Sequence, residues 1–277
     1  MIGMVMAAAL SAAPACVPPP GTEALLATPQ RVIVIGEMHG TAETPAAFAE
    51  IVCAAAERGP VTVALELPQG MQPSLDAFLA APDAAAALAA LEGSPFLDPA
   101  MNDGRSSEAM LAMLNSVREL KLAGRDVAFH AFQPSQSRPR GLDQSWYELD
   151  MGHILAMAVF ARADARVLAL VGNLHARKTA IDRFPDLGLP AAAHLPAADT
   201  LTLNVAQQGG EAWNCQRECG PNASISTYDG EARGVVLEPA GDGAYDGVLA
   251  LGPTTASPPV RPAADDQPSP TSSGSSS

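Results

Sequence analysis

The chain has 277 residues and is strongly acidic, with 30 Asp and Glu against 16 Lys and Arg and a formal net charge of −14. Nucleic acids and anionic membranes attract basic surfaces, so this charge argues against both as partners. Aromatic residues make up only 4% of the sequence, which argues against an RNA-stacking surface or a carbohydrate platform. The length and the 48% hydrophobic content suit one globular domain with a sizeable core, and the expected partner is a small-molecule or peptide ligand. The oligomeric state stays open.

The N-terminal residues 1–15 are apolar and end in Ala13-Pro14-Ala15, which is similar to the A-x-A cleavage site of a secretory signal. The positive region usual in such signals is missing, because no Lys or Arg precedes Arg31. We expect export, to the periplasm in a bacterium, with residues 16–30 as an N-terminal arm. A lipid anchor on Cys16 is the less favoured alternative, because Ala13 stands where lipoprotein signals carry Leu. No other segment has the ~18 consecutive apolar residues of a transmembrane helix.

The four cysteines are Cys16, Cys53, Cys215 and Cys219. An even number in an exported chain favours disulfides, and four cysteines allow three pairings. We favour Cys16–Cys53, tying the arm to the first helix, and Cys215–Cys219 as a small local loop. The spacing of Cys215 and Cys219 differs from that of a zinc ribbon, so a structural zinc is not expected.

Hydrophobic periodicity and turn residues predict alternating strands and helices in the first half of the chain. The predicted elements are, in order, the strand Val32–Ile35, the helix Pro45–Arg58, the strand Val61–Leu67, helical segments in Ser74–Leu91 and Glu108–Ala123, the strand Asp126–Phe132 and a polar loop Gln133–Gln144.

The second half has weaker signals. Its predicted elements are the helix Trp146–Ala163, the strand Arg166–Val171, a short helix Arg177–Phe184, and weak strands at Ala191–Leu195, Leu201–Val205, Gly234–Leu237 and Gly247–Leu251. From Pro253 onward the chain is rich in Pro, Ser, Thr and Asp, so residues 253–277 are expected to be a disordered tail. The alternation predicts a single α/β domain over residues 31–252. It has a central, mainly parallel sheet flanked by helices, a helical insertion after the second strand, and late strands that add an antiparallel part.

Side chains able to do chemistry follow the predicted strands. Glu37 and His39 come after the first strand, Glu66 lies at the end of the second, and Asn173 and His175 follow the fourth. In open α/β sheets ligands bind at the carboxyl ends of strands, so these residues are expected to face one crevice. Glu66 is the strongest signal, because a carboxylate inside an apolar strand is costly unless a cation or a proton donor partners it.

Two chemistries fit these side chains, and the sequence leaves both open. Glu37, His39, Glu66 and His175 could hold a divalent metal (Zn, Mn or Ca) with a bound water. Alternatively, a histidine oriented by a carboxylate could act as a general base on water without any metal.

Four further residues are expected to contact a ligand: His130, Asn173, Arg138 and Arg140. The arginines could recognise an anionic group, with a solvated loop as the alternative. His130 lies in the third strand and could equally be a core histidine.

Two short motifs, G-E-M-H at Gly36–His39 and G-N-L-H at Gly172–His175, bracket Glu66-Leu67. Together they resemble the superfamily that joins erythromycin esterases, ChaN-like haem-binding lipoproteins and Tiki/TraB metalloproteases. The resemblance spans Arg31 to His175 and is strongest to the esterase and ChaN-like branches.

The resemblance implies a site made of Glu37, His39, Glu66 and His175. The branches imply different chemistries: water activation by histidine, haem binding or metal-dependent peptide cleavage. Of these chemistries, the expected one is hydrolysis of an ester or amide by an exported protein. The alternative is a non-catalytic haem- or ligand-binding protein that uses the same crevice. No tyrosine in the sequence has an obvious match to the tyrosine haem ligand of the haem-binding branch.

Overall fold

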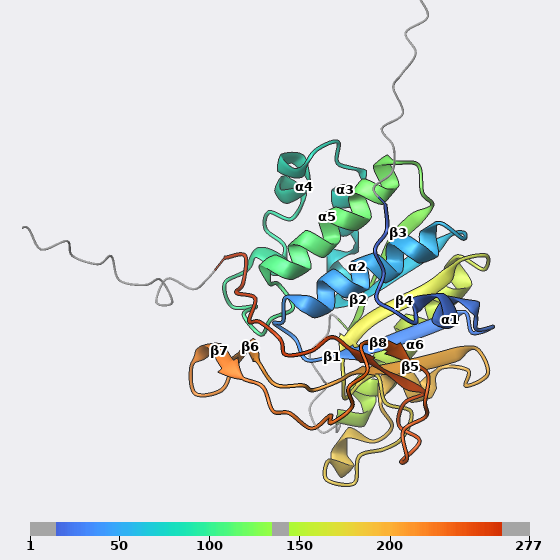
Figure 1. Ribbon diagram of the computed structural model, residues 1–277. Helices are drawn as coiled ribbons and strands as arrows, with labels where there is room; N and C mark the ends of the chain where they lie inside the picture. The colour runs from blue at the N-terminus through green and yellow to red at the C-terminus, as the bar shows by residue number, and fades with distance from the viewer. Residues whose placement is uncertain (1–14, 135–143, 262–277) are drawn as a thin grey trace, which may run out of the picture.

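The structure, a computed structural model, describes residues 15–134 and 144–261 (Figure 1). Its centre is a seven-stranded sheet in the order β3-β2-β4-β1-β5-β9-β8. Every neighbouring pair in this sheet is parallel except β8 and β9, which are antiparallel. The strands are β1 (Val32–Glu37), β2 (Val61–Pro68), β3 (Val127–Gln133), β4 (Arg166–Gly172), β5 (Thr200–Val205), β8 (Gly234–Val236) and β9 (Gly247–Ala250).

Helices cover both faces of this sheet (Figure 1). Helices α2 to α5 pack on one face and α6 on the other, so the prediction of an α/β fold with a mainly parallel sheet is confirmed. The helices are α1 (Thr22–Ala27), α2 (Glu43–Ala56), α3 (Gln72–Ala80), α4 (Ala84–Ala90), α5 (Glu108–Leu122) and α6 (Gln144–Ala161).

The strand β1 shows why the sheet needs a helical layer on each side. All six of its residues are buried, which is the pattern of a central parallel strand. Successive side chains of a strand point to opposite faces. Ile33 and Ile35 accordingly join the core under α2 to α5, and Val32 and Val34 join the core under α6.

The strand order brings three of the four predicted strand ends together. The strand β4 lies between β1 and β2, and Glu37 at the end of β1 is in register with Gly172 at the end of β4. The carboxyl ends of β2, β4 and β1 therefore share one edge of the sheet. The third predicted strand, β3, lies at the outer edge beyond β2, farther from this point.

The late strands are less antiparallel than expected. The strand β5 pairs in parallel with both β1 and β9, and only the edge strand β8 runs the other way. Two features were not predicted: α1, and an antiparallel hairpin made of β6 (Glu211–Cys215) and β7 (Cys219–Ala223).

The predicted helix Arg177–Phe184 is wrong, because the structure has only bends, a turn and irregular backbone there. Two of its three cationic side chains are held by a distant segment instead: Arg177 pairs with Asp242 at 2.8 Å, and Lys178 pairs with Asp246. The segment has no apolar stripe that would stabilise a helix against the core, so these tertiary contacts outweigh its local helix propensity.

The predicted strand Ala191–Leu195 is also wrong. A 3₁₀-helix, Ala191–His194, is found instead, and the backbone N–H of Ala191 donates to the Glu148 carboxylate at 3.0 Å. Pro190 and Pro196, on either side, cannot donate to a strand ladder.

Both favoured disulfides are present, Cys16–Cys53 and Cys215–Cys219. The first ties the N-terminal arm to α2. A sulfur in a disulfide cannot also carry a lipid thioether, so this bond and a lipid anchor on Cys16 exclude one another. None of the helices in the described ranges has the length and apolar character needed to cross a bilayer.

The expected disordered tail is wrong for the part from Pro253 to Arg261, while residues 262–277 lie outside the described ranges. This segment runs along the domain, where the Ala42 N–H donates to the Thr255 carbonyl and the Glu108 N–H to that of Pro258. Composition alone missed these contacts, because they are made by the backbone.

Buried Ser257 in this segment caps the first turn of α5. Its Oγ accepts a hydrogen bond from the Ala109 N–H at 2.9 Å. This N–H lies in the first turn, where no backbone carbonyl of the helix is available as its acceptor. We expect Ser257→Ala to lower the free energy of unfolding by about 1 kcal/mol. Urea titration would measure this, with exposed Thr255→Ala as the control. Equal stability of the two variants would contradict the capping role.

Candidate functional site

The site begins with the sharp turn that follows β1. Glu37 is 4% exposed, and its Oε1 lies 3.0 Å from Nδ1 of His39. Gly40 ends the turn with φ +79°, and a Cβ there would lie 1.9 Å from the Trp213 carbonyl oxygen of the hairpin. Only glycine fits this conformation and this approach, so the sequence and the hairpin together fix where His39 stands.

Glu66, at the end of β2, is the centre of the site. It is 7% exposed, and its Oε2 accepts from the Gly172 N–H at 2.6 Å and lies 3.3 Å from Nε2 of His39. Its Oε1 lies 3.5 Å from the Arg105 guanidinium and 3.8 Å from Nε2 of His175. These cationic and N–H partners offset the free-energy cost of burying the Glu66 carboxylate, as the sequence predicted.

Sequence reasoning missed Arg105 and Asp103, which lie in the irregular segment before α5. The Arg105 Nε lies 3.1 and 3.0 Å from the two Asp103 oxygens, and Nη2 lies 2.5 Å from Oδ2. Asp103 therefore fixes the guanidinium whose Nη1 faces Glu66. A loop with no periodic pattern gave no signal for these two residues.

Glu148, on α6, was also missed. It is 0% exposed, and its Oε1 and Oε2 lie 2.7 and 2.8 Å from Nδ1 of His175. Its Oε2 also accepts from the Ala191 N–H. A signal was present in the sequence: Glu148, Met151, Leu155 and Ala158 have the spacing of one buried helical stripe, and all four are buried.

The electrostatics follow from these neighbours. Burial alone would raise the pKa of Glu66, but His39, His175 and Arg105 outweigh it and hold that pKa well below its usual range. Burial alone would lower the pKa of His39, but Glu66 and Glu37 raise it to about 10. The pKa of Glu37 is raised by its burial, which the His39 ring only partly offsets. The pKa of His175 is raised, since Glu148 and Glu66 outweigh its burial.

Glu37, His39 and His175 line a cleft of about 290 Å³ at the carboxyl edge of the sheet. Both acidic and amide side chains line it, together with two apolar ones. The lining residues are Glu37, Met38, His39, Asp103, Gly172, Asn173, Leu174, His175 and Asn214. A space of this size admits part of a small molecule or a peptide side chain.

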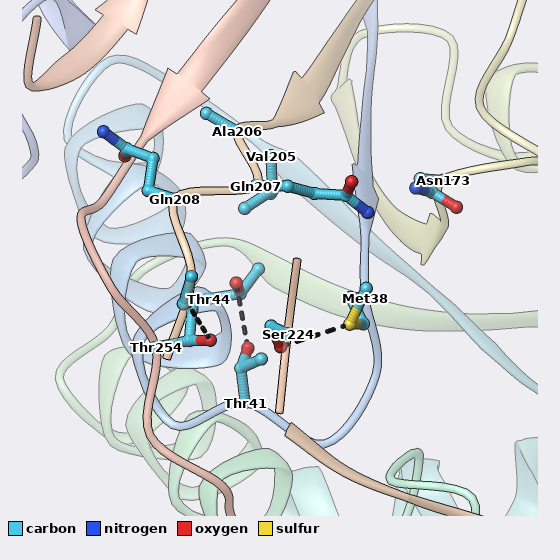
Figure 2. Close-up of a pocket in the computed structure, with 11 residues that line it drawn as sticks. Met38, Thr41, Thr44, Asn173, Val205, Ala206, Gln207, Gln208, Ser224 and Thr254 are labelled. Atoms are coloured by element: carbon cyan, nitrogen blue, oxygen red, sulfur yellow. Dashed lines mark hydrogen bonds between the residues drawn. The ribbon is translucent and has the colours of Figure 1, made fainter. Parts of the chain in front are cut away.

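A second, narrower cavity lies beside the site cleft and shares Met38 and Asn173 with it (Figure 2). Hydroxyl and amide side chains line much of it, and Thr41 donates to Thr44 at 3.1 Å. The residues that line it include no Asp, Glu, His, Lys or Arg. The ionisable side chains described above therefore line the site cleft and not this second cavity.

The other predicted ligand contacts have different outcomes. Asn173 lines the cleft, and the Tyr245 hydroxyl donates to its carbonyl at 2.7 Å. His130 is not among the residues that line the cleft, and its Nε2 lies 3.0 Å from the Ile154 carbonyl of α6. Arg138 and Arg140 lie outside the described residues.

The residues proposed as metal ligands do not fit a divalent cation. Within the described ranges, no group of three or more His, Cys, Asp or Glu is arranged to hold one. Both ring nitrogens of His39 are turned to carboxyl groups, and the Arg105 guanidinium stands beside Glu66. In this arrangement the carboxyl oxygens and ring nitrogens that a metal would need are paired with one another and with Arg105.

Comparison with known proteins identifies the fold. No family model and no curated protein matches the chain. A Bacillus cereus protein has a similar structure, with a TM-score of 0.57 and 12% identity over 82% of this chain and 89% of that one. A variant of the erythromycin esterase EreC, in its open conformation, gives 0.55 and 13% over 84% and 94%. The type III effector HopBA1 gives 0.53 and 15% over 87% and 98%.

At these identities the similarity concerns the fold. The chain has the architecture of erythromycin esterase, as the resemblance of the two Gly-x-x-His motifs implied.

Proposed function

We propose that the protein is a hydrolase that activates water to cleave an ester or amide bond in the site cleft. The observation that carries this proposal is the convergence on Glu66: Nε2 of His39 lies 3.3 Å and Nε2 of His175 lies 3.8 Å from its two oxygens. Histidine beside a fixed carboxylate is a common arrangement for general base catalysis on water.

The charges around Glu66 suit the transition state of such a reaction. Attack by water on a carbonyl carbon places negative charge on the carbonyl oxygen. The His39 ring, which lines the cleft, and the Arg105 guanidinium, which Asp103 holds beside Glu66, supply positive charge near the cleft. The residues that carry the proposal are therefore Glu37, His39, Glu66, Arg105 and His175.

The ligand is a small molecule or a peptide segment. The amide side chains of Asn173 and Asn214 and the apolar side chains of Met38 and Leu174 line the cleft beside the charged groups. Such a lining suits a largely neutral ligand whose polar groups are few.

Export, to the periplasm in a bacterium, is part of the proposal. The Cys16–Cys53 and Cys215–Cys219 disulfides support it, since stable disulfides belong to oxidising compartments. The Cys16–Cys53 bond favours a protein without a lipid anchor at Cys16.

Haem binding is the second candidate, and one observation favours it. Tyr147 lies beside His175, with ring centroids 6.2 Å apart, and both residue types ligate haem iron. Burial and the neighbouring Glu66, however, raise the pKa of Tyr147 to about 12. Because the phenolate is the form of tyrosine that ligates iron, the raised pKa of Tyr147 opposes haem ligation. Hydrolysis is therefore the favoured candidate function.

The two candidates differ in a direct assay. Purified protein is incubated with 4-nitrophenyl esters and 4-nitroanilides, with and without EDTA, and is separately titrated with haemin. We expect release of 4-nitrophenol or 4-nitroaniline that EDTA does not change, no saturable Soret shift, and full activity in the control His153→Ala, an exposed histidine of α6. Saturable haem binding without hydrolysis would replace the first candidate by the second.

A further inference from the structure

The second cavity opens directly beside the site cleft, and Met38 and Asn173 line both spaces (Figure 2). Asn173 is two residues from His175, and its backbone is fixed on both sides. Its N–H donates to the Glu37 carbonyl at 2.8 Å, and its carbonyl accepts from the Tyr245 hydroxyl at 2.7 Å. A ligand with one group in the cleft can therefore place a neighbouring group in this cavity.

The size of the cavity limits what that neighbouring group can be. Its free volume is about 20 Å³, against about 290 Å³ for the cleft. A cavity needs roughly 10–15 Å³ of such space to hold one water molecule. The second cavity therefore has room for one small functional group and no room for a sugar ring or an aromatic ring.

Most hydroxyl groups of the cavity are already bonded within the protein. Thr41 donates to Thr44 at 3.1 Å. Ser224 donates to the sulfur of Met38 at 3.6 Å, and Thr254 donates to a backbone carbonyl at 2.9 Å. The protons of these three donor hydroxyls are therefore not available to a ligand, and recognition depends on the amide side chains.

Two side-chain amides of the lining have unused hydrogen-bonding capacity. Neither Nδ2 of Asn173 nor Nε2 of Gln207 donates to any residue in the described ranges. The Gln207 oxygen accepts from the Thr227 hydroxyl at 3.2 Å, and the Gln207 side chain points toward Asn173 (Figure 2). An amide nitrogen has two protons to donate, and the Asn173 oxygen can accept. A carbonyl oxygen and an N–H of one ligand group would thus both find partners.

We infer that the second cavity binds a neutral amide group of the substrate, next to the bond that is cleaved, and that Asn173 and Gln207 select it. This inference rests on the proposed hydrolase function and specifies its substrate. The residues that line the cavity carry no ionisable side chain, and the chain's net charge of −14 disfavours an anionic group. A hydrocarbon group would displace water from both amides and leave them unpaired, which costs binding free energy.

Three 4-nitrophenyl esters with acyl chains of equal length test this selection. The N-acetylglycyl ester offers a carbonyl and an N–H, the 4-oxopentanoyl ester a carbonyl alone, and the pentanoyl ester neither. The nitrophenyl ring is too large for the cavity, so only the acyl chain can enter it. After division by the uncatalysed rates, we expect kcat/KM to fall in this order, by about tenfold from first to last. Equal values would overturn the inference.

Gln207→Met keeps the length of the side chain and removes its amide. We expect the preference for the N-acetylglycyl ester over the pentanoyl ester to fall by about tenfold, mainly through KM, because the lost hydrogen bond is made before and during the reaction alike. Gln30→Met, two residues before β1 at the opposite edge of the sheet, is the matched control. An unchanged preference in Gln207→Met would contradict the assignment of Gln207.

Binding can be followed without any hydrolysis. The side-chain NH₂ signals of Asn173 and Gln207 are observed in ¹H–¹⁵N correlation spectra and are assigned with Asn173→Ala and Gln207→Met. We expect saturable shifts of both signals with N-acetylglycinamide and much smaller shifts with pentanamide, which lacks the internal amide. Equal shifts with the two compounds, or no shift of either signal, would overturn the inference.

The cavity and the reaction fail separately. Selective binding of N-acetylglycinamide without hydrolysis of any of the three esters would remove the hydrolase function and keep the amide site. Hydrolysis with equal preference for the three acyl chains would keep the hydrolase function and remove the amide site. If Gln207→Met does not fold, the ester series and the spectra of the wild-type protein decide.

Discussion

Replacing Glu66 by alanine is expected to lower the free energy of unfolding by about 3–5 kcal/mol, which is typical of breaking a buried ion pair. The carboxylate is the shared partner of His39, Arg105 and the Gly172 N–H. Its removal leaves His39 and Arg105 with one carboxyl partner each, Glu37 and Asp103, and takes the acceptor from the Gly172 N–H. We expect hydrolysis to be lost in the same variant, because the water loses an acceptor.

Urea titration followed by circular dichroism would measure this change. Exposed Glu238→Ala is the matched control and should stay within about 0.5 kcal/mol of wild type. Glu66→Gln keeps an oxygen for the Gly172 N–H and should recover only part of the loss. If Glu66→Ala were as stable as the control, Glu66 would not be the electrostatic centre of the site.

Raising the pH above neutrality is expected to destabilise the protein. The pKa of His39 rises from 6.5 in the unfolded chain to about 10 in the fold, so its contribution is complete below pH 6.5 and disappears as the pH rises toward 10. One such group costs roughly 1.4 kcal/mol per pH unit in this window, or about 3 kcal/mol from pH 7 to 9.

On the acidic side two groups act in opposite directions. The depressed pKa of Glu66 contributes stability above pH 4.5 that is lost as the pH falls, whereas the raised pKa of Glu37 costs stability above pH 4.5. The alkaline limb is therefore the cleaner measurement. Urea midpoints from pH 6 to 9.5 should fall in the wild type and fall less steeply in His39→Gln. Parallel curves would show that His39 is not held as a cation.

The core of the site could be predicted from the sequence because the strand pattern itself places it. Buried apolar runs end at Glu37, Glu66 and Gly172, and parallel strands carry their ends to one edge. His130 also follows this logic, yet its strand lies at the sheet edge and its ring bonds to α6. Periodicity locates a strand but does not give its place in the sheet.

The remaining site residues depend on contacts that have no local signature. Arg105 and Asp103 come from an irregular loop, and the tertiary fold alone brings them to Glu66. Glu148 is different, since a carboxylate on a buried helical stripe could have been found by the argument that singled out Glu66.

The wrong predictions of secondary structure also result from contacts between residues that are remote in the sequence. The segments around Arg177 and Ala191 take their form from Asp242, Asp246 and Glu148, which are remote in the sequence. The tail segment around Ser257 is ordered by backbone hydrogen bonds to α2 and α5, which composition does not reveal.

The central claim, that the groups converging on Glu66 activate water, is tested most directly by one kinetic comparison. The value of kcat/KM is measured for wild type and for the double variant His39→Ala/His175→Ala, both verified as folded, on the 4-nitrophenyl ester that wild type cleaves fastest. We expect the double variant to lose at least about 1,000-fold. A loss of less than about tenfold would show that the hydrolysis occurs elsewhere, and would contradict the assignment of the site.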